Sequence, residues 1–419
     1  MVQRIVAAPG MKIAFVNKHC ELGGIETVVQ QLHRGFKARG FECDFWFSEN
    51  PGNAPIPGMR PMYPKVLDRL HRTRFNRQIE RLFPRFQWTS RAFDSLRESD
   101  YDIIHVHGFD ETYATLEALR TLAGTKPLAL TLHSTWLFTG GCGQPAGCER
   151  YLDACGDCPQ AGEWPIPPSD NTAEQLEHKR RVLRDASIHF ISPSRHLREK
   201  ALRSTPGRNW SIAHLPNGVD TSFFHGRGKR DVELRHACGV EPERTIILAM
   251  CRDFRDPVKG PAIMATALQA LDCADVQVLL VGAYGEQFAE KLPKRLNAVA
   301  VGYVSDIQKR RELYTIADIF LFSSVAETFP CVILEAMSSE CCVVSTPLEA
   351  VREQLQHGET GFVAGAFTGE ALARELSRVC ISPAVAAQAG AKARIAVERT
   401  FSESTMLDQH EAFYRELLK

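Results

Sequence analysis

The alternation of short apolar runs with helical stretches, kept along nearly the whole chain, constrains the fold more than any other feature of this sequence. Each run is short, apolar and leads into a loop, which is typical of a buried parallel strand. The runs occupy residues 12–17, 43–48, 102–107, 128–133 and 188–194, and then 245–250, 276–282, 298–304, 319–324, 341–346 and 361–364. Strands that alternate with helices predict a parallel sheet with helices on both faces. We therefore predict an α/β protein with two consecutive doubly wound domains.

The length of 419 residues agrees with two domains of ordinary size. Proline and Asn-Gly turn signals between residues 194 and 225 indicate the join. We expect a first domain over 1–210, a second over 211–400, and a last helix over 401–419 that packs back on the first domain. Ligands of doubly wound sheets bind at the carboxyl ends of the strands, so a cleft between the two domains is the expected site.

Charge and composition exclude several classes of protein. The chain has 50 Lys and Arg against 50 Asp and Glu, and its charged fraction of 24% is ordinary. A net charge of zero provides no global field for nucleic acid, so no nucleic-acid partner is expected. No apolar run approaches the ~20 residues that span a bilayer, and residues 1–10 lack the apolar core of a signal peptide. We expect a cytoplasmic protein, whose 13 cysteines are thiols or metal ligands rather than disulfides.

Paired glycines, Gly23 and Gly24, follow the first apolar run and directly precede a helical stretch. Glycines at a strand-to-helix turn allow the backbone to approach a phosphate, and the helix start adds N–H groups and partial positive charge. A tight turn that needs glycine for its own geometry is the alternative. The pattern is not Gly-x-Gly-x-x-Gly, so no nicotinamide cofactor is expected, and no Gly-x4-Gly-Lys-Ser/Thr motif indicates an ATPase.

Two glutamates, Glu327 and Glu335, flank a turn and a helix start after the apolar run 319–324. The first can sit on the loop at the strand's end and the second on the following helix, so that both carboxylates face one cleft. Such carboxylates suit hydrogen bonding to vicinal sugar hydroxyls. The amides at the helix start, around Phe329, Pro330, Cys331 and Val332, would meet a negatively charged group. Solvated surface glutamates are the alternative.

Several segments together resemble one family, the retaining glycosyltransferases of family 4, which have the GT-B fold. The segments are GGIETVVQQL (23–32), DIIHVHG (102–108), LTLH (130–133), FISPS (190–194), LPNGVD (215–220), ELYTIADIFLFSS (312–324) and HGETGFVA (357–364), beside the two glutamates. The cysteine pattern of residues 130–160 is most similar to the colanic-acid-type branch of bacterial exopolysaccharide transferases. The resemblance implies two Rossmann-like domains that face each other across a cleft, and a hexosyltransferase of surface polysaccharide or lipopolysaccharide assembly.

The resemblance also implies roles for individual residues. Glu335 would bind the ribose hydroxyls of a nucleotide-sugar, Glu327 the hydroxyls of the donor sugar, and Gly24 would lie against the diphosphate. His133 matches the family histidine that faces the donor sugar near the reaction centre. A strand-end histidine whose ring is bonded to a backbone carbonyl is the alternative for His133.

A cation pair normally neutralises the departing diphosphate in this family, and the segment MCRDFRDPVKGP (250–261) holds the matching residues. Lys259 matches well, and the arginine is Arg252 or Arg255, of which we favour Arg252. Two positive charges at the leaving group would stabilise charge that develops in the transition state. Surface cations are the alternative. The family's usual Gly-Gly is absent from PLEAVRE (347–353), which puts the identity of the donor in question.

Catalysis on the family precedent needs no protein nucleophile, because the acceptor hydroxyl attacks on the face that the diphosphate leaves. Retention then depends on a dry cleft and positioned charges. The Asp-x-Asp at residues 100–102 directly precedes a buried run and is expected to be a strand-entry turn, so catalysis should be metal-independent and need no cofactor. The expected donor is a UDP- or GDP-sugar, and the expected acceptor is a lipid-linked glycan. A small soluble acceptor and a catalytically silent scaffold are the alternatives.

Four cysteines, Cys142, Cys148, Cys155 and Cys158, fall within 17 residues of a Gly- and Pro-containing loop. Four thiolates can surround one tetrahedral zinc ion, and the terminal Cys-x2-Cys is the usual half of such a site, although the first spacing is longer than usual. Two disulfides and unligated thiols are the alternatives. A zinc bound by four cysteines would be structural, and its position just after His133 suggests that the loop shapes the acceptor side of the cleft.

The stretch 64–93 is basic within a neutral chain, and its arginines alternate with apolar residues. This composition predicts an interfacial helix that contacts anionic lipid headgroups. Such a contact would suit a lipid-linked acceptor and would hold the protein peripherally at the cytoplasmic face of the inner membrane. An amphipathic domain helix with a solvated basic face is the alternative.

Overall fold

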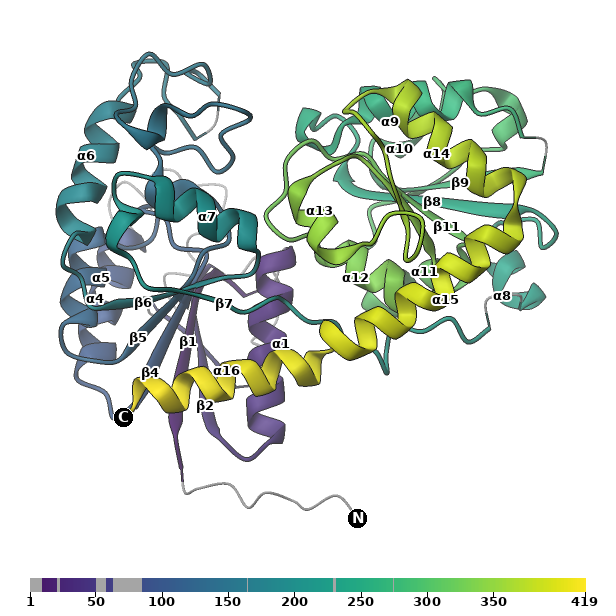
Figure 1. Ribbon diagram of the computed structural model, residues 1–419. Coiled ribbons are helices and arrows are strands. Elements are labelled where there is room, and N and C mark those ends of the chain that lie inside the picture. Colours follow the sequence, from purple (N-terminus) through teal and green to yellow (C-terminus); the bar gives the residue numbers. More distant parts are fainter. Residues whose placement is uncertain are drawn as a thin grey trace. The chain divides into compact units, whose positions relative to one another are not determined.

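The computed structural model describes residues 10–20, 23–49, 58–62, 85–163, 165–228, 231–273 and 275–419, with the backbone alone for 85–88. The chain divides into two compact units, which Figure 1 draws with most of their helices and strands labelled. The N-terminal unit comprises Met1–Pro216 together with Met406–Lys419, and the C-terminal unit comprises Asn217–Thr405.

The described part of the N-terminal unit holds a seven-stranded parallel sheet in the order β3-β2-β1-β4-β5-β6-β7. Its strands are β1 (Lys12–His19), β2 (Glu42–Glu49), β3 (Met59–Pro61), β4 (Ile103–His107), β5 (Leu128–Thr131), β6 (Ile188–Ser192) and β7 (Ile212–His214). The order of the strands reverses between the neighbours β1 and β4. A topological switch point therefore lies at the carboxyl ends of these two strands.

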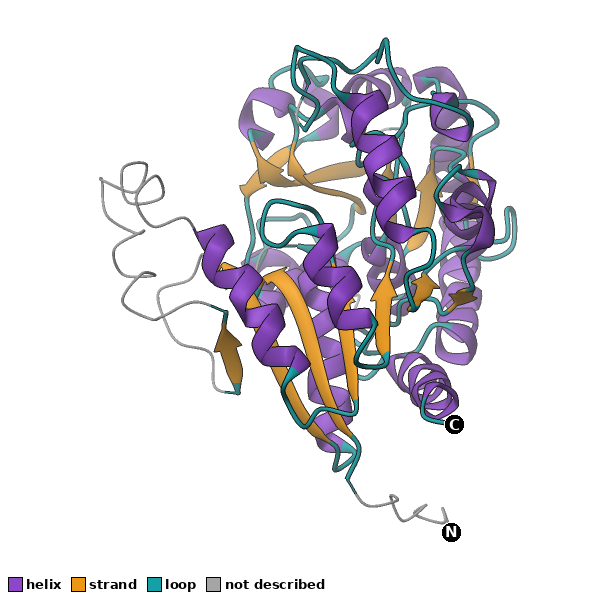
Figure 2. Cartoon of the chain, turned by 90° about the vertical axis from the view of Figure 1, so that its left-hand side faces the viewer, coloured by secondary structure: helices purple, strands orange, loops and turns teal. Residues whose placement is uncertain are grey.

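Helices cover both faces of this sheet, as Figure 2 shows for the strands and the helices beside them. The helices are α1 (Gly24–Ala38), α4 (Arg85–Arg97), α5 (Leu116–Ala123), α6 (Thr172–Leu183), α7 (Arg195–Arg203) and α16 (Glu403–Leu417), with 3-10 turns at Trp136–Phe138, Arg150–Leu152 and Gly207–Asn209. Because side chains alternate along a strand, Val16 and Val106 pack with α4, α5 and α6. Phe15 and His105 face Phe36 of α1 and Tyr414 of α16.

The described part of the C-terminal unit holds a six-stranded parallel sheet in the order β10-β9-β8-β11-β12-β13. Its strands are β8 (Thr245–Asp253), β9 (Val276–Ala283), β10 (Val299–Gly302), β11 (Ile319–Phe322), β12 (Cys342–Ser345) and β13 (Phe362–Val363). Its helices are α8 (Val232–Ala237), α9 (Pro261–Ala270), α10 (Gly285–Ala289), α11 (Ile307–Ile316), α12 (Cys331–Ser338), α13 (Glu349–Gln354), α14 (Gly369–Ile381) and α15 (Pro383–Thr400), with 3-10 turns at Pro257–Lys259 and Lys294–Leu296. One apolar cluster joins the sheet to α11, α12 and α15, and another joins its opposite face to α9, α10 and α14.

The predicted pair of parallel, helix-covered sheets is confirmed, and every apolar run that was expected to be a strand forms one. Two strands were not predicted, β3 and β7. Each has three residues and pairs at the edge of the sheet, so neither carries the apolar run that marks a buried strand. None of the helices within the described residues is long and apolar enough to cross a membrane.

Candidate active site

The switch point of the C-terminal sheet lies between β8 and β11, which are parallel neighbours. The turn that carries Lys259 and Gly260 follows β8, and the loop that carries Glu327 follows β11. Ligands of doubly wound sheets bind where the strand order reverses, so these two loops form the expected binding edge of the unit.

The turn that holds Lys259 is fixed to the end of β11. Gly260 adopts a left-handed conformation with a φ of 62°, and a Cβ there would lie 2.0 Å from the carbonyl oxygen of Ser323. The Ser323 hydroxyl donates to the Lys259 carbonyl at 2.7 Å, and the Val325 amide donates to the Val258 carbonyl at 2.9 Å. The glycine permits this close approach, and the two hydrogen bonds hold the backbone of Lys259 against the loop of Glu327.

Lys259 and Glu327 form an ion pair, with Nζ 2.7 Å from Oε1. Their side chains are 28% and 19% exposed. Burial by itself lowers the pKa of Lys259, but the charge of Glu327 and their hydrogen bond outweigh burial, so the pKa is raised. The lysine is therefore an ammonium that a carboxylate neutralises, and an incoming phosphate could replace that carboxylate as its partner.

The two arginines near Lys259 differ in their partners. Arg255 pairs with Asp253 at 2.8 Å, and its guanidinium carbon lies 3.3 Å from the centre of the Tyr284 ring. Arg252 is exposed and forms no ion pair within the part of the chain that the structure describes. Both arginines are exposed, but only the guanidinium of Arg255 is engaged by an ion pair among the described residues.

Glu335 lies in α12 and is only 3% exposed. Its Oε1 accepts a short hydrogen bond from Arg310 of α11. Oε2 is buried and makes no hydrogen bond of regular geometry among the described residues, although the buried Tyr314 hydroxyl interacts with this carboxylate. The charge of Glu335 raises the pKa of Arg310 against the opposing effect of burial. A buried carboxylate oxygen without a donor is costly unless a ligand supplies one. Sequence reasoning missed Arg310, because a basic helix surface at residues 309–311 looks solvated.

The start of α12 offers backbone N–H groups to a ligand. The residues there are Phe329, Pro330, Cys331 and Val332, and no side chain caps the helix. Burial raises the pKa of the Cys331 thiol to about 12, and the charges of Glu335 and Glu327 act in the same direction, so both carboxylates lie within electrostatic range of this helix start. An anion beside it would meet N–H groups and the positive end of the helix dipole.

In the N-terminal unit, Gly23 and Gly24 lie beyond the carboxyl end of β1, beside the switch point of that sheet. Gly23 has a φ of −162°, which is extended backbone that any residue adopts, so turn geometry does not require glycine there. A Cβ at Gly24 would meet no atom within 4 Å, and a Cβ at Gly23 would lie 3.4 Å from Glu26, an ordinary contact. The space around these glycines is open, and α1 begins without a capping side chain.

His133 follows β5, and its ring contacts a second histidine. Its Nε2 lies 2.9 Å from Nδ1 of His107, the last residue of β4, and the two rings stack with centres 5.2 Å apart. Burial lowers the pKa of His133 to about 3, and His410 acts in the same direction, so the ring is neutral. Sequence reasoning missed His107, because the alternation in a strand indicates a buried position but not the partner.

The four cysteines Cys142, Cys148, Cys155 and Cys158 line one cavity of about 20 Å³. Each is partly buried, and none of these four forms a disulfide. The buried Lys179 side chain donates to the Trp136 carbonyl at 2.7 Å and to the Thr139 carbonyl at 3.1 Å, beside the loop, and burial lowers the pKa of Lys179 to about 7. No three of the four sulfur atoms all lie within 4.8 Å of one another. Another cluster of described residues does have three possible ligand atoms within that distance.

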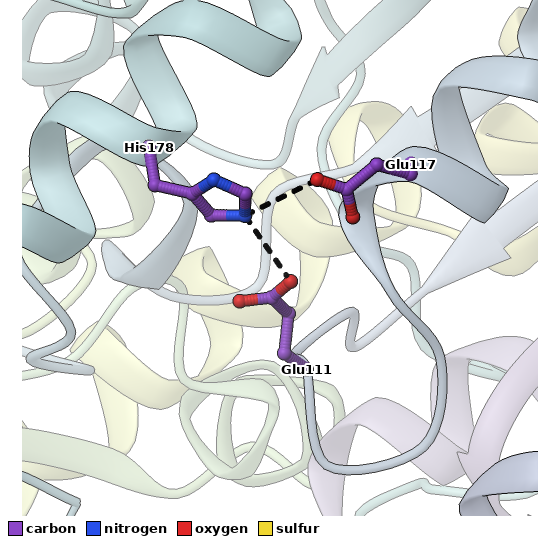
Figure 3. A group of neighbouring side chains, drawn as sticks. All are labelled: Glu111, Glu117 and His178. Atoms are coloured by element: carbon purple, nitrogen blue, oxygen red, sulfur yellow. Dashed lines mark ion pairs between the residues drawn. The ribbon is translucent and has the colours of Figure 1, made fainter.

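That cluster consists of Glu111, Glu117 and His178 (Figure 3). Nε2 of His178 lies 3.6 Å from a carboxylate oxygen of each glutamate. Arg181 donates to Nδ1 of His178 at 3.3 Å, and because arginine cannot accept, the proton of a neutral His178 ring lies on Nε2. Nε2 then turns its N–H toward the two carboxylates rather than offering a lone pair to a metal. The cluster ties α5 to α6.

Two other expectations concern parts of the chain away from these groups. Residues 64–84 of the basic stretch lie outside the described residues, so the membrane contact stays a prediction. The turn at residues 100–102 precedes β4, so it lies at the amino end of that strand, whereas the switch point lies at the carboxyl end. There Asp102 accepts from the Lys12 amide at 2.8 Å, and Asp100 binds the Lys12 ammonium at 2.5 Å.

The sequences of both units match known families. Residues 22–223 match the family described as Glycosyltransferase Family 4, and residues 244–381 match the family described as Glycosyl transferases group 1.

Similar proteins cover nearly the whole chain. "Putative colanic acid biosynthesis glycosyl transferase WcaC" of Escherichia coli (strain K12) is 24% identical over 424 residues, which are 97% of this chain and 100% of that protein. "N-acetyl-alpha-D-glucosaminyl L-malate synthase" of Bacillus anthracis is 21% identical over 405 residues, 95% of each chain. Among solved structures, HepE of Anabaena in complex with UDP and glucose gives a TM-score of 0.69 at 18% identity, over 97% of this chain and 100% of HepE.

Proposed function

Because the chain belongs to the glycosyltransferases of family 4 and has the GT-B fold, we propose that it is a retaining hexosyltransferase whose donor is a nucleoside diphosphate sugar. The observation that carries this proposal is the Lys259–Glu327 ion pair at the switch point of the C-terminal sheet. A departing diphosphate needs a cation and a sugar needs polar groups for its hydroxyls. Both kinds of group stand at one edge of a doubly wound sheet, where such ligands bind.

Glu335 is proposed to bind the ribose of the donor. Its buried Oε2, which makes no regular hydrogen bond among the described residues, supports this role, because a ribose hydroxyl would supply a donor. Arg310 holds the carboxylate through Oε1. Glu327 is proposed to bind hydroxyls of the transferred sugar once Lys259 turns from the carboxylate to the diphosphate.

The leaving diphosphate is proposed to be neutralised by Lys259 and Arg252. The exposed, unpaired guanidinium of Arg252 within the described chain supports its choice over Arg255, which Asp253 and Tyr284 engage. The uncapped start of α12 and the open backbone at Gly24 add N–H groups for the phosphates. With these charges in place, no metal ion is needed at the leaving group, and we propose that catalysis is metal-independent.

The reaction proposed is attack of an acceptor hydroxyl on the anomeric carbon from the face that the diphosphate leaves. The bond between that carbon and the diphosphate oxygen breaks, the new glycosidic bond forms, and the hydroxyl proton passes to the departing phosphate oxygen. This sequence retains the anomeric configuration without a protein nucleophile. His133 is proposed to contact the donor sugar near the anomeric carbon, as a neutral hydrogen-bonding group.

The acceptor is proposed to be a lipid-linked glycan in bacterial surface polysaccharide assembly, reached from the cytoplasmic face of the membrane. Similarity over the whole chain to the colanic acid transferase supports this choice. A second candidate is a small soluble acceptor, which similarity over 95% of the chain to the malate synthase supports. Full activity on a free acceptor without any lipid would favour the second candidate.

The proposal is tested by calorimetric titration of UDP, GDP, ADP and CDP into the purified protein, with Glu335→Ala beside it. We expect one diphosphate, UDP or GDP, to bind clearly to the wild type and more weakly to the variant. If none of the four binds, the transferase proposal fails and a catalytically silent scaffold replaces it.

We also propose that the cysteine loop binds one structural zinc ion. Four thiols around one cavity supply the ligand set of a closed tetrahedral site. Burial lowers the pKa of Lys179 and negative charge on Cys142 and Cys155 acts in the opposite direction, so a zinc tetrathiolate would favour the protonated lysine, which offsets its charge. The sulfurs would draw closer together on binding. Metal analysis should give about one zinc per chain, lost in Cys155→Ser and kept in the control Cys273→Ser, outside the loop. A folded protein that binds no zinc would refute the site.

A further inference from the structure

Histidines of β4, of the loop after β5 and of α16 meet on the face of the N-terminal sheet that α1 and α16 cover. His105 and His107 are fully buried on β4, and their ring centres are 4.0 Å apart. His105 has a partner on each ring nitrogen, because Nδ1 lies 2.6 Å from the Tyr414 hydroxyl and Nε2 lies 2.7 Å from the Thr131 hydroxyl. His105 is thus a core histidine whose hydrogen-bonding groups are all used within the fold.

His107 differs from His105 in where its polar groups point. Its Nδ1 lies 2.9 Å from Nε2 of His133, and its own Nε2 is buried without a hydrogen-bond partner among the described residues. A buried nitrogen without a hydrogen-bond partner lowers the stability of the folded protein. Among the described residues, the hydrogen bond that the His107 side chain makes is with a residue of the proposed active site.

We propose that His107 is a positioning residue that fixes the orientation and the tautomer of His133, so that His133 carries its proton on Nδ1 and acts as a hydrogen-bond donor toward the donor sugar. This inference rests on the proposed function, since it concerns the reaction in which His133 takes part.

The positions available to the proton of each ring indicate the tautomer of His133. A neutral imidazole carries one proton, on Nδ1 or on Nε2. If His133 donated from Nε2, His107 would accept at Nδ1 and keep its own proton on Nε2, as a buried N–H without an acceptor. Among backbone groups, a buried N–H without an acceptor is rarer than an under-satisfied carbonyl, and we extend that preference to the imidazole nitrogen. If His107 donates from Nδ1 instead, its Nε2 is an unpaired acceptor, and the proton of His133 lies on Nδ1.

Packing and charge state both support a fixed pair. The His107 ring lies against the His105 ring and 6.4 Å from the centre of the Phe15 ring. Burial lowers the pKa of His107 well below its ordinary value, and His105, His133 and His410 act in the same direction. Both rings of the pair are therefore neutral at ordinary pH, and each has one proton to place.

The first test is NMR of the full-length protein labelled with ¹⁵N-histidine, with the His133 signals assigned by their loss in His133→Gln. We expect the Nδ1–H tautomer of His133 in the wild type. His107→Phe keeps the ring and removes Nδ1, so we expect it to give a mixture of tautomers. The matched control His105→Phe, on the same strand, should leave the His133 tautomer unchanged. An Nε2–H tautomer in the wild type, or no change in His107→Phe, would overturn the inference.

The second test follows diphosphate release from UDP-glucose, UDP-galactose, UDP-N-acetylglucosamine and GDP-mannose without acceptor. His107→Phe should lower kcat by about 10- to 100-fold, the loss that follows at metal sites when a residue that orients a metal ligand is removed. The KM for the donor should change less than ~2-fold. In a His133→Ala background the same substitution should cost nothing further. His107→Asn, which keeps a donor near the position of Nδ1, should recover part of the rate.

The two failures can be told apart. Equal losses from His107→Phe in both backgrounds would mean that His107 is only structural, which overturns the inference and leaves the transferase intact. A wild type that hydrolyses none of these sugars and binds no nucleoside diphosphate would refute the proposed function, while the NMR result still decides the His107–His133 bond.

Discussion

The two candidate edges of this protein are built from opposite kinds of polar group. In the N-terminal unit, His107 and His133 form a neutral, stacked pair. In the C-terminal unit, Lys259 is paired with Glu327 and Arg310 with Glu335, all as ions. A neutral buried pair needs no counter-charge and can keep its geometry when a ligand arrives, whereas a diphosphate must compete with a carboxylate for its cation. Under the proposed function, the N-terminal unit would supply fixed geometry, and the C-terminal unit would supply charged groups that exchange one partner for another when the donor binds.

Lys259→Ala should have the largest effect, because it removes the charge at the leaving group. We expect kcat to fall by about 100- to 1000-fold, with a much smaller change in the affinity for the diphosphate. Steady-state kinetics measure both. The control is Arg255→Ala, which removes a guanidinium already engaged by Asp253 and should change kcat only a few-fold. A defect confined to acceptor affinity would contradict the division between the two units.

Glu335→Ala should come second, and it tests whether the other ion pair serves the donor. We expect the nucleoside diphosphate to bind about 10- to 100-fold more weakly. The free energy of unfolding should also fall by about 3 kcal/mol, because Arg310 keeps its charge without a partner. Calorimetry and urea denaturation give the two quantities.

The control for this variant is Glu312→Ala, which breaks the more exposed pair with Lys309 on the same helix as Arg310. It should cost less than about 0.5 kcal/mol and leave binding unchanged. If Glu335→Ala destabilises the protein but binds the diphosphate as the wild type does, the carboxylate is structural and the ribose assignment is lost.

The sequence predicts these two edges unequally well. Lys259 and Glu327 are 68 residues apart, yet each follows an apolar run, so parallel pairing of those runs brings them together. Arg310 could not be found in this way, because its partner lies on another helix and its own surroundings look solvated. His107 could be recognised as buried, but only its ring geometry relates it to His133. Likewise, the spacing of the four cysteines predicts one loop and leaves the distances between their sulfur atoms open.

Acidification should weaken the N-terminal unit and so sharpen the contrast between neutral and charged pairs. Burial lowers the pKa values of His105 and His107 well below the ordinary value of 6.5. Between pH 7 and pH 5.5 the unfolded chain therefore binds protons that the folded chain does not, so stability rises with pH and is lost as the pH falls. Each fully buried histidine should cost about 1 kcal/mol across that window.

Urea denaturation at a series of pH values measures this loss. His105→Phe removes one titrating group, so its decrease in unfolding free energy should be smaller than that of the wild type by about 1 kcal/mol. The raised pKa of Lys259 keeps that group charged throughout the window, so Lys259→Ala should leave the slope as it is. A wild-type stability that does not change between pH 7 and pH 5.5 would mean that these histidines are not held neutral by burial.

Gly24→Ala should have the smallest effect on stability. It tests whether the glycine is needed for the fold or for binding of the donor. A Cβ at Gly24 would meet no protein atom within 4 Å, and the residue begins α1, so alanine should stabilise the protein by about 0.5 kcal/mol. The same methyl group would stand where the proposal brings the diphosphate, so the transfer rate should fall several-fold. Gly365→Ala, another position where a Cβ meets nothing, is the control and should leave the rate unchanged. If Gly24→Ala transfers sugar as fast as the wild type, the glycine does not serve the donor, and the N-terminal edge contributes its histidines alone.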